Sequence, residues 1–515
     1  MADIAVIALS LLLLTITGIV WRVRRVRGKH SLRSVAILVL GDIGRSPRMM
    51  YHAQSFAENG FLTDLIGYGG SKPIPSLSRL PKVRIHYIPE LPKMFDSLPW
   101  IVRAPIRIAH QVVSIFLCLI VYIETPPEFI LVQNPPSIPT LALVQLIGRV
   151  RGSKVIIDWH NLGYSILAMR VGKDHFLVRL AKSFEQTFGY SAYAHLFVTK
   201  AMRDFLVKEW DLQGHKIVLH DRPPRSFHRS TTQEIHNLFQ KLKPALFQEK
   251  SLRNFLPDAS GQYTTYFTEI TNPSSHTAKN IPTFTKLSMP ALRPDRPALL
   301  VSSTSWTADE NFDILLDALE KYNNRADELA ATTSGTNARL PKVLVIVTGK
   351  GPLREETLSK VAKMQESWKW VRFISLWLEA ADYPVLLGSA DLGISLHSSS
   401  SGLDLPMKVI DMFGCGLPVC ALNFTCLGEL VKDGENGLVF DTSEQLASQF
   451  EDLLVSFPDA PRLRSLVSNL ASLRRNTSPP VYHTAVDGEE SPAWGTWEEN
   501  WTRAIRPIIL HDVNL

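Results

Sequence analysis

The residues with the clearest chemical signal lie in a loop and a helix near the C-terminal end of the chain. Residues 391–396 predict a short buried strand, a Ser/Gly-rich loop follows, and residues 406–413 predict a helix that starts at a proline. The first N–H groups of a helix lack partners inside the helix, so this arrangement favours an anion, usually a phosphate. We therefore expect Ser400, Gly402 and the start of this helix to contact phosphate.

Two charged side chains of the same helix extend this prediction from a phosphate to a nucleotide. Lys408 adds a positive charge one turn into the helix. Asp411 follows three residues later on nearly the same helix face, and its carboxylate suits the paired hydroxyls of a ribose. The helix thus offers one group to a diphosphate and one to the sugar of a nucleotide.

Two earlier loops in the same half of the chain have a similar form. Ser303 and Thr304 follow one predicted strand, and Lys350 and Gly351 follow the next. Each loop alone is weak evidence, because short Ser- or Gly-rich turns are common. In a parallel sheet, however, the carboxyl ends of the strands meet at one edge, so all three loops converge on one site. This convergence favours a nucleotide-binding domain over an α/β domain with ordinary turns.

The sequence carries no metal-binding pattern beside these loops. It has neither a P-loop nor an Asp-x-Asp pair of the kind that bridges a metal and a diphosphate. We expect backbone N–H groups, Lys350 and Lys408 to stabilise a leaving diphosphate. No metal or other cofactor is then obligatory, and stimulation by a divalent cation is left open.

The first half of the chain also predicts a doubly wound α/β sheet. Strand-like apolar runs alternate with helical segments, which is typical of parallel strands joined by helices. The first run, residues 34–40, ends in a turn that lacks the Gly-x-Gly-x-x-Gly dinucleotide pattern. Ligands of such sheets lie beyond the carboxyl ends of the strands. The polar residues predicted there are Asp42, Arg45, Gln133, Asn134, Asp158, His160, Asn161, Thr199 and Lys200.

An apolar segment at the start of the chain predicts a membrane anchor. Residues 4–20 carry no charge and are about long enough to span a bilayer, and a run of Arg and Lys follows at residues 22–29. A cleavable signal peptide is the alternative, but it would carry its positive charge before the apolar run. The positive-inside rule places everything after Arg22 in the cytosol, so we expect a single-pass protein with a cytosolic body.

A second apolar stretch, residues 100–123, has two interpretations. Its uncharged part is short for a membrane span, and Arg103 and Arg107 lie one turn apart. A buried core helix fits this pattern, and so does a surface helix that dips into the cytosolic leaflet with its arginines at headgroup level. The sequence leaves this choice open.

The composition sets outer limits on the function. A chain of 515 residues suffices for two domains, and 45% hydrophobic with 20% charged residues is typical of globular proteins. The net charge of +6 suits an anionic ligand or membrane surface but is too diffuse to indicate nucleic acid. The four cysteines lack zinc-ligand spacing, so we expect a reducing compartment without disulfides.

These patterns divide the chain into five parts. We expect a membrane anchor and basic flank at 1–30, a first Rossmann-like domain at 31–225 and a linker with a variable insert at 226–290. A nucleotide-binding domain is expected at 291–480, and a C-terminal helix that packs back on the body at 481–515. The resemblance described next implies that the 291–480 domain is a nucleotide-sugar donor domain.

The nucleotide-site motif and three other segments resemble known enzymes. The donor-domain signature of GT-B glycosyltransferases is similar to Pro406-x-Lys408-x-x-Asp411-Met-Phe-x-Cys-Gly416-x-Pro418-Val419, with Asp411 where Glu is usual. The chain more specifically resembles the eukaryotic chitobiosyldiphosphodolichol beta-mannosyltransferase family in residues 398–421, 41–49, 158–164 and 221–224. The resemblance covers nearly the whole chain apart from polar inserts near 260–280 and 325–340.

The resemblance implies a fold and a reaction. The fold would be GT-B, with two Rossmann-like domains facing a cleft and an N-terminal transmembrane helix. The family would transfer mannose from GDP-mannose to the second GlcNAc of dolichyl-diphosphate-linked chitobiose, making a β1,4 linkage on the cytosolic face of the endoplasmic reticulum. The implied partners are donor, acceptor, membrane lipid and other transferases of the dolichol pathway.

A β product from an α-linked donor requires inversion, and inversion requires a general base near the acceptor hydroxyl. The candidates are Asp42, Asp158 and His160. We favour Asp42, because its glycine neighbours expose it, with turn capping as the alternative role for these residues. Arg45 and Arg48 are the candidates for binding the lipid diphosphate.

Two other functions stay open. A transferase of the same architecture could use another nucleotide sugar, because the sequence around residues 375–378 does not reveal which base is bound. A non-catalytic scaffold that binds nucleotide in the same membrane complex is the second, and the presence of Lys408, Asp411 and Asp42 argues against it.

Overall fold

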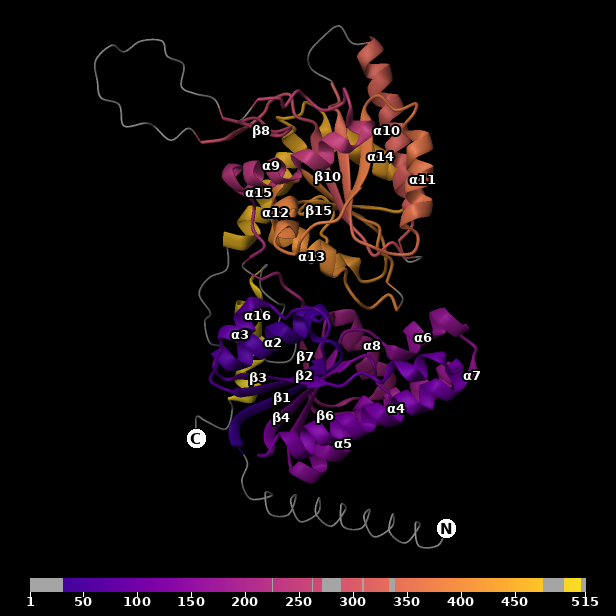
Figure 1. Ribbon diagram of the computed structural model, residues 1–515, viewed down its shortest axis with the longest axis vertical. Helices are drawn as coiled ribbons and strands as arrows, with labels where there is room; N and C mark the ends of the chain where they lie inside the picture. Colours follow the sequence, from indigo (N-terminus) through magenta and orange to yellow (C-terminus); the bar gives the residue numbers. More distant parts are fainter. Residues whose placement is uncertain are drawn as a thin grey trace, which may run out of the picture. The chain divides into compact units, whose positions relative to one another are not determined.

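The computed structural model shows a chain divided into two compact units. It describes residues 31–224, 226–261, 263–270, 289–307, 310–332, 339–399, 401–475 and 495–510. The predicted anchor at 1–30 and much of the two predicted inserts lie outside the described residues. Unit 1 comprises residues 1–220 with 504–515, and unit 2 comprises residues 221–503. Each unit is built around one sheet with helices on its faces (Figure 1).

Unit 1 contains a parallel sheet of seven strands in the order β3-β2-β1-β4-β5-β6-β7. The order reverses beside β1, which pairs with β2 on one side and β4 on the other; ligands of doubly wound sheets bind at such a point. Ile37 of β1, for example, lies between Leu65 of β2 and Leu131 of β4, and all three are fully buried. The strands are β1 (Ser31–Asp42), β2 (Leu62–Tyr68), β3 (Val83–Ile88), β4 (Pro127–Asn134), β5 (Lys154–Trp159), β6 (Ser191–Phe197) and β7 (Gln213–Val218).

Helices connect these strands, as the alternating pattern predicts. They are η1 (Ile43–Arg45), α2 (Pro47–Glu58), α3 (Pro75–Arg79), η2 (Lys93–Ser97), α4 (Trp100–Phe116), η3 (Leu117–Tyr122), α5 (Thr140–Arg151), α6 (Gly163–Val171), α7 (Phe176–Gly189) and α8 (Lys200–Trp210). The short α17 (Arg506–Ile509) also belongs to unit 1, where the Tyr193 hydroxyl donates a 2.8 Å hydrogen bond to the carbonyl of Ile508.

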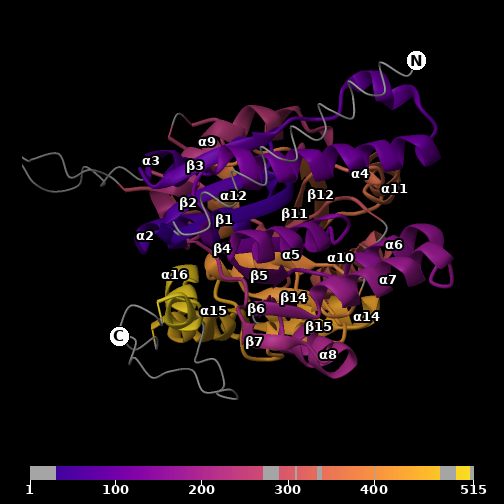
Figure 2. The same cartoon turned by 90° about the horizontal axis from the view of Figure 1, so that it is seen from below.

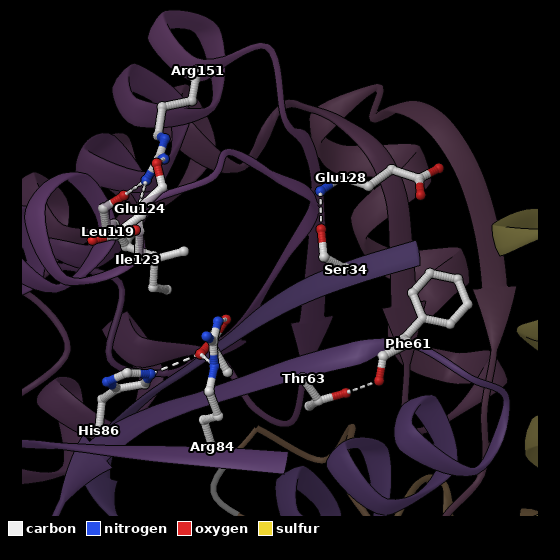
Figure 3. A network of polar contacts seen from close by, with 11 residues as sticks. Ser34, Phe61, Thr63, Arg84, His86, Leu119, Ile123, Glu124, Glu128 and Arg151 are labelled. Carbon is white, nitrogen blue, oxygen red and sulfur yellow. Dashed lines mark hydrogen bonds and ion pairs between the residues drawn. The ribbon is translucent and has the colours of Figure 1, made fainter. Parts of the chain in front are cut away.

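The apolar stretch 100–123 forms α4 and the π-helical turn η3, and it is not a core helix along its whole length. Within the described residues, the segment Val102–Tyr122 is long and apolar enough to cross a membrane, but only 33% of it is buried. Its C-terminal end is fixed by the buried Arg151 at the end of α5. This guanidinium donates to the carbonyls of Leu119, Ile123 (2.8 Å) and Glu124 (3.0 Å) (Figure 3).

Unit 2 repeats the same strand order in a parallel sheet of six strands, β12-β11-β10-β13-β14-β15. They are β10 (Ala298–Ser303), β11 (Val343–Thr348), β12 (Val371–Leu376), β13 (Leu392–Ser395), β14 (Val419–Leu422) and β15 (Gly437–Phe440). Every residue of β10 and β11 is buried, because helices cover both faces of the sheet. A small antiparallel pair, β8 (Thr268–Glu269) and β9 (Ala291–Leu292), precedes it.

The helices of unit 2 pack into two hydrophobic clusters, one on each face of the sheet. They are α9 (Thr232–Gln248), η4 (Lys250–Leu252), α10 (Phe312–Thr332), α11 (Arg354–Met364), α12 (Asp382–Ser389), α13 (Met407–Gly414), η5 (Leu427–Glu429), α14 (Ser443–Leu454) and α15 (Pro461–Arg475). Neither cluster includes residues of α16 (Trp497–Ala504), whose Trp497 and Trp501 are buried. Along the chain, unit 2 ends at Arg503, within this helix.

The stretch predicted as a linker at 226–290 begins with a long helix. Residues 232–248 form α9, which starts with a capping box between Thr231 and Glu234. Its apolar side chains, among them Phe239, pack with Leu299 and Val301 of β10. This stretch is therefore part of unit 2, because an amphipathic helix of this length needs a surface on which to bury its apolar face.

Candidate active site

The loop after β10 is held by a buried carboxylate that the sequence analysis did not single out. Glu310 accepts a hydrogen bond from the hydroxyl of Thr304 and one of 3.0 Å from the N–H of Ser305. Its second oxygen forms an ion pair with Nζ of Lys408 on α13. Glu310 thus joins two of the three predicted donor loops, and it places the Lys408 ammonium beside Thr304.

The backbone of the loop after β11 packs against the backbone of the loop after β10. A Cβ at Gly349 would lie 1.8 Å from the carbonyl oxygen of Thr304, and one at Gly351 would lie 1.8 Å from that of Ser305. Gly349 also has φ +124°, which side chains disfavour. The glycines are therefore required by this close approach, which brings the predicted donor residues Ser303, Thr304, Lys350 and Gly351 to one edge of the sheet.

Lys350 lies over an exposed aromatic ring. Its Nζ is 3.9 Å from the ring centroid of Trp377, which follows β12 and is 65% exposed. A cation over an indole face is attracted by the ring quadrupole. An exposed tryptophan at the carboxyl edge of a nucleotide-binding sheet offers a flat surface for a base, although an isolated exposed aromatic is also common on protein surfaces.

Asp411 belongs to a short chain of hydrogen bonds. The Tyr383 hydroxyl lies 3.0 Å from Oγ of Ser303 and donates to Oδ2 of Asp411 at 3.5 Å. Protein surrounds the carboxylate on most sides, and this desolvation raises the pKa of Asp411 to about 7. A ribose hydroxyl that donated to this carboxylate would favour its ionised form.

The Ser/Gly loop before α13 is organised around another carboxylate, Asp404. The hydroxyls of Ser399 and Ser401 both donate to Oδ1 of Asp404, and the N–H of Gly402 donates to Oγ of Ser399 at 2.9 Å. The Gly402 N–H is therefore already bonded inside the loop, and Ser400 lies outside the described residues. Pro406, the N-cap residue of α13, makes no side-chain cap, so the first turn of this helix stays the better candidate for phosphate.

In unit 1, Asp158 at the end of β5 lies at the centre of a buried charge cluster. Arg48 of α2 binds both of its oxygens at 2.8 Å, and Nε2 of His52 and of His160 lie 3.2 Å and 2.8 Å from Oδ2. Burial alone would raise the pKa of Asp158, but Arg48 and His160 hold it well below its usual range. Burial lowers the pKa of His52, which favours the neutral ring.

This cluster changes the assignment of Arg48. The side chain is buried and bidentate to Asp158, and it also donates to the carbonyl of Leu219 at 2.9 Å. A guanidinium held in this way is not presented to a lipid diphosphate, so we withdraw that prediction for Arg48. Arg45 is exposed beside Asp42, and its role stays a prediction.

Asp42 caps the turn after β1. Its Oδ1 accepts from the N–H of Gly44 at 3.0 Å, and its Oδ2 accepts from the N–H of Ser71 at 2.9 Å. Burial is the largest single effect and would raise the pKa of Asp42, but the hydrogen bonds from Ser71 and Gly44 and the charge of Arg45 together outweigh it, so the pKa is lowered. A carboxylate with these bonds is a weaker proton acceptor, which favours the capping alternative for this residue.

His160 is the candidate base with the more suitable setting. Its backbone N–H donates to the carbonyl of Asn134 at 2.8 Å, which places the residue between the ends of β4 and β5. The ring keeps partial solvent access while Nε2 contacts the ionised Asp158. With the proton on Nε2, the lone pair on Nδ1 can accept a proton, and Asp158 stabilises the resulting imidazolium.

Comparison with known proteins identifies the family. The chain is 39% identical over 99% of its length to chitobiosyldiphosphodolichol beta-mannosyltransferase from Mus musculus, of which it covers 95%. The chain belongs to this family of beta-mannosyltransferases. It is also 38% identical, over 93% of its length and 97% of the relative, to the UDP-glycosyltransferase TURAN from Arabidopsis thaliana. Residues 296–456, almost all in described parts of unit 2, match the family model "Glycosyl transferases group 1".

Solved structures give the fold of this mannosyltransferase-family chain. Anabaena Alr3699/HepE, solved in complex with UDP and glucose, superposes with a TM-score of 0.52 at 14% identity, covering 86% of this chain and 94% of that one. The GT-B prediction is confirmed, and the chain is a glycosyltransferase. The family match lies on the unit that carries Glu310, Lys408 and Asp411.

Two carboxylates of the site were not predicted from the sequence, because their partners are distant along the chain or lie in ordinary polar loops. Glu310 and Asp404 lie in polar loops where a carboxylate is unremarkable, and nothing in their spacing indicates a partner 98 residues away, as for Glu310 with Lys408. Among the described residues no group of three His, Cys, Asp or Glu side chains could hold a metal ion. Independence from a metal stays a prediction.

Proposed function

We propose that the protein transfers mannose from GDP-mannose to the second GlcNAc of dolichyl-diphosphate-linked chitobiose and forms a β1,4 linkage. The near full-length similarity to relatives named for this acceptor carries the proposal. The residues add a chemical rationale, since unit 2 has the groups for a nucleotide diphosphate and unit 1 has a histidine and a carboxylate suited to proton transfer.

The donor diphosphate replaces Glu310 as the partner of Lys408. The ion pair holds the ammonium beside Thr304 before the donor arrives, and phosphate oxygens then accept from Lys408 and from the first N–H groups of α13. The hydroxyls of the ribose donate to Asp411, and the base stacks on Trp377. Lys350, displaced from the indole face, is then available to the diphosphate.

His160 is the general base. Its Nδ1 takes the proton from O4 of the acceptor sugar as O4 forms a bond to C1 of mannose. The bond between C1 and the phosphate oxygen breaks, GDP leaves with the electron pair, and the configuration at C1 inverts. Asp158 does not take the proton; it keeps the imidazole in the required tautomer and stabilises its charge.

The second candidate is the same reaction type with another donor. The relative from Arabidopsis thaliana is named a UDP-glycosyltransferase, and neither Trp377 nor Asp411 discriminates between guanine and uracil. Purified full-length protein should be assayed with labelled GDP-mannose, UDP-glucose and UDP-GlcNAc on chitobiosyl-diphosphodolichol. We expect transfer from GDP-mannose alone, and a product sensitive to β-mannosidase but not to α-mannosidase.

Transfer from a UDP-sugar alone would replace the mannosyl proposal, and binding of GDP without any transfer would favour a scaffold.

For location, we propose the endoplasmic reticulum membrane, with residues 4–20 crossing it once and the body in the cytosol, in a complex with other transferases of the pathway. In sealed microsomes, external protease should then degrade a C-terminal tag. A protected tag would reverse the proposed topology.

A further inference from the structure

Helix α4 turns an apolar face outward. Its residues Val102, Ile106, Ala109 and Val113 recur every three or four positions and so form one stripe, which Leu117 at the start of η3 continues. All of them keep solvent access, and Val113 is 57% exposed. The polar residues Gln111 and Ser114 are buried on the other side of the helix. This distribution is the reverse of that expected for a helix that faces water.

The neighbouring helices continue this face. In unit 1, α4 packs beside α5, α5 beside α7, and α7 beside α6, and both views show them together (Figures 1 and 2). Every residue of the apolar helix α6 keeps some exposure. On α7, Phe176 and Leu180 are 62% and 59% exposed. Further apolar residues exposed on these helices are Leu146, Val150, Met169 and Val171.

The charged side chains that α4, α5, α6 and α7 expose to solvent are all positive. Each helix carries an exposed arginine, namely Arg107, Arg149, Arg170 and Arg179. Arg107 lies four residues before Gln111, so it is on the side of α4 away from the apolar stripe, whereas the other three lie near exposed apolar residues of their helices. The single acidic residue in the sequences of α4 to α7 is Glu185, and it is buried. It accepts hydrogen bonds from the N–H groups of Gly163 (3.0 Å) and Tyr164 (3.2 Å), and so fixes the start of α6 against α7. Apolar side chains with interspersed arginines match an anionic membrane surface.

The ends of α4 determine how it meets a membrane. Cys118, Leu119 and Ile120 of η3 are buried, and Arg151 donates to the carbonyls of Leu119 and Ile123. A transmembrane orientation of Val102–Tyr122 would withdraw these residues from unit 1 and leave the Arg151 guanidinium buried without its acceptors. The helix is therefore suited to lie along a bilayer surface rather than across it.

We propose that the outward faces of α4, α5, α6 and α7 form a membrane-docking surface of unit 1. Their apolar side chains enter the headgroup region of an anionic bilayer, and their arginines bind lipid phosphates. The proposal takes from the proposed function only that the partner is a membrane. Docking through this face would hold unit 1 at the height of a lipid-linked acceptor, separately from the anchor predicted at residues 4–20.

Site-directed fluorescence tests this contact on the full chain. The four native cysteines are buried, so a single cysteine placed at Val113 or Leu180 can be labelled with a polarity-sensitive dye. Phe247 of unit 2, 74% exposed at the end of α9, is the matched control. The labelled proteins are reconstituted into vesicles of phosphatidylcholine and phosphatidylinositol that contain a nitroxide lipid.

We expect quenching and a blue shift at 113 and 180 and neither at 247, with weaker quenching in phosphatidylcholine alone. Unquenched dyes at both 113 and 180 would overturn the proposal and indicate a face that meets water or another protein. Because no transfer is measured, this result is independent of whether the chain uses GDP-mannose.

A charge introduced into the face gives a second, functional test. Val113→Glu combined with Leu180→Glu should raise the apparent KM for acceptor embedded in these vesicles by about tenfold or more, because two apolar contacts are lost and two negative charges approach anionic lipid. Activity on detergent-solubilised acceptor should be unchanged, and Phe247→Glu should change neither. Equal losses in vesicles and detergent would indicate damage to the fold and would contradict the proposal if the dye at 113 and 180 is also unquenched.

Discussion

The sheets of the two units have the same strand order, but the helices that cover them differ in how much apolar surface they expose. In unit 2, α10 buries Phe312, Leu315 and Leu319 in a core, as an amphipathic helix on a soluble domain does. In unit 1, α4 and α6 leave apolar residues exposed. Among the described residues, most of the exposed large hydrophobic side chains belong to unit 1. In each unit the doubly wound sheet determines where a ligand site forms. The helices that cover the sheet determine whether the outer surface of the unit is polar or apolar.

The two sheet edges also use buried carboxylates in different ways. Asp158 in unit 1 is held by Arg48 on both oxygens and by two histidines, all at 3.2 Å or less. Glu310 in unit 2 holds Lys408, whose single ammonium sits on a flexible stem. The first arrangement is rigid and suits a base that must keep one tautomer. The second suits a cation that exchanges its partner for a diphosphate.

The largest expected effect comes from a substitution that disrupts the charge cluster around Asp158. Asp158→Ala leaves the buried Arg48 without its counter-charge and should lower the free energy of unfolding by about 3–5 kcal/mol, measured by urea denaturation. Asp174→Ala, an exposed acid in the turn between α6 and α7, is the control and should stay within about 0.5 kcal/mol of wild type. Similar values for both variants would show that the Asp158 cluster contributes little to stability.

The next effect separates the two candidate bases. His160→Ala should lower kcat by about 10²–10⁴-fold while GDP binding is unchanged, because the proton acceptor is lost and unit 2 is untouched. Asp42→Asn keeps one of the two hydrogen bonds that cap the turn and should lower kcat far less. The reverse order in the same radiolabel assay would return the assignment to Asp42 and remove His160 from the mechanism.

A smaller effect tests the exchangeable cation of unit 2. Lys408→Ala should weaken GDP binding by about 10–100-fold, because a charge-assisted contact to the diphosphate is lost. Lys360→Ala removes an exposed lysine of α11 that pairs with Asp313, and it serves as the matched control. Isothermal titration calorimetry compares the two variants, and equal affinities would place the diphosphate elsewhere on unit 2.

The smallest effect concerns pH. The pKa of Asp411 is raised to about 7 by desolvation, so the folded state binds this proton more tightly than the unfolded chain. Stability from this group is therefore lost as pH rises from about 4 toward 7, and it stays low above 7. Asp411→Asn should flatten this dependence and stabilise the protein at pH 8 by about 1–2 kcal/mol, a value reduced because the carboxylate keeps solvent access.

The same variant should bind GDP more weakly, since a ribose contact is lost. Thermal unfolding between pH 5 and pH 8, followed with and without GDP, measures both effects. An unchanged pH profile in Asp411→Asn would show that another group titrates in this range.

The architecture and the donor half of the site follow from the sequence alone. Alternating apolar runs and helical segments impose a parallel sheet, and a parallel sheet gathers the loops after β10, β11 and β13 at one edge. Ser303, Lys350 and Lys408 could therefore be predicted together, because their proximity follows from chain topology. Motif similarity then supplied the family, which full-length relatives confirm.

Which side chains pair becomes visible in the folded structure, because pairing depends on distances in space that spacing along the sequence does not encode. Arg48 and Asp158 are 110 residues apart, and their contact converts a predicted phosphate ligand into part of a buried cluster. Asp42 accepts a hydrogen bond from the N–H of Ser71, which favours the capping role over the predicted role as a base. The stretch 100–123 was ambiguous because a core helix and a membrane-surface helix have the same composition. They differ only in which face the neighbouring elements leave uncovered.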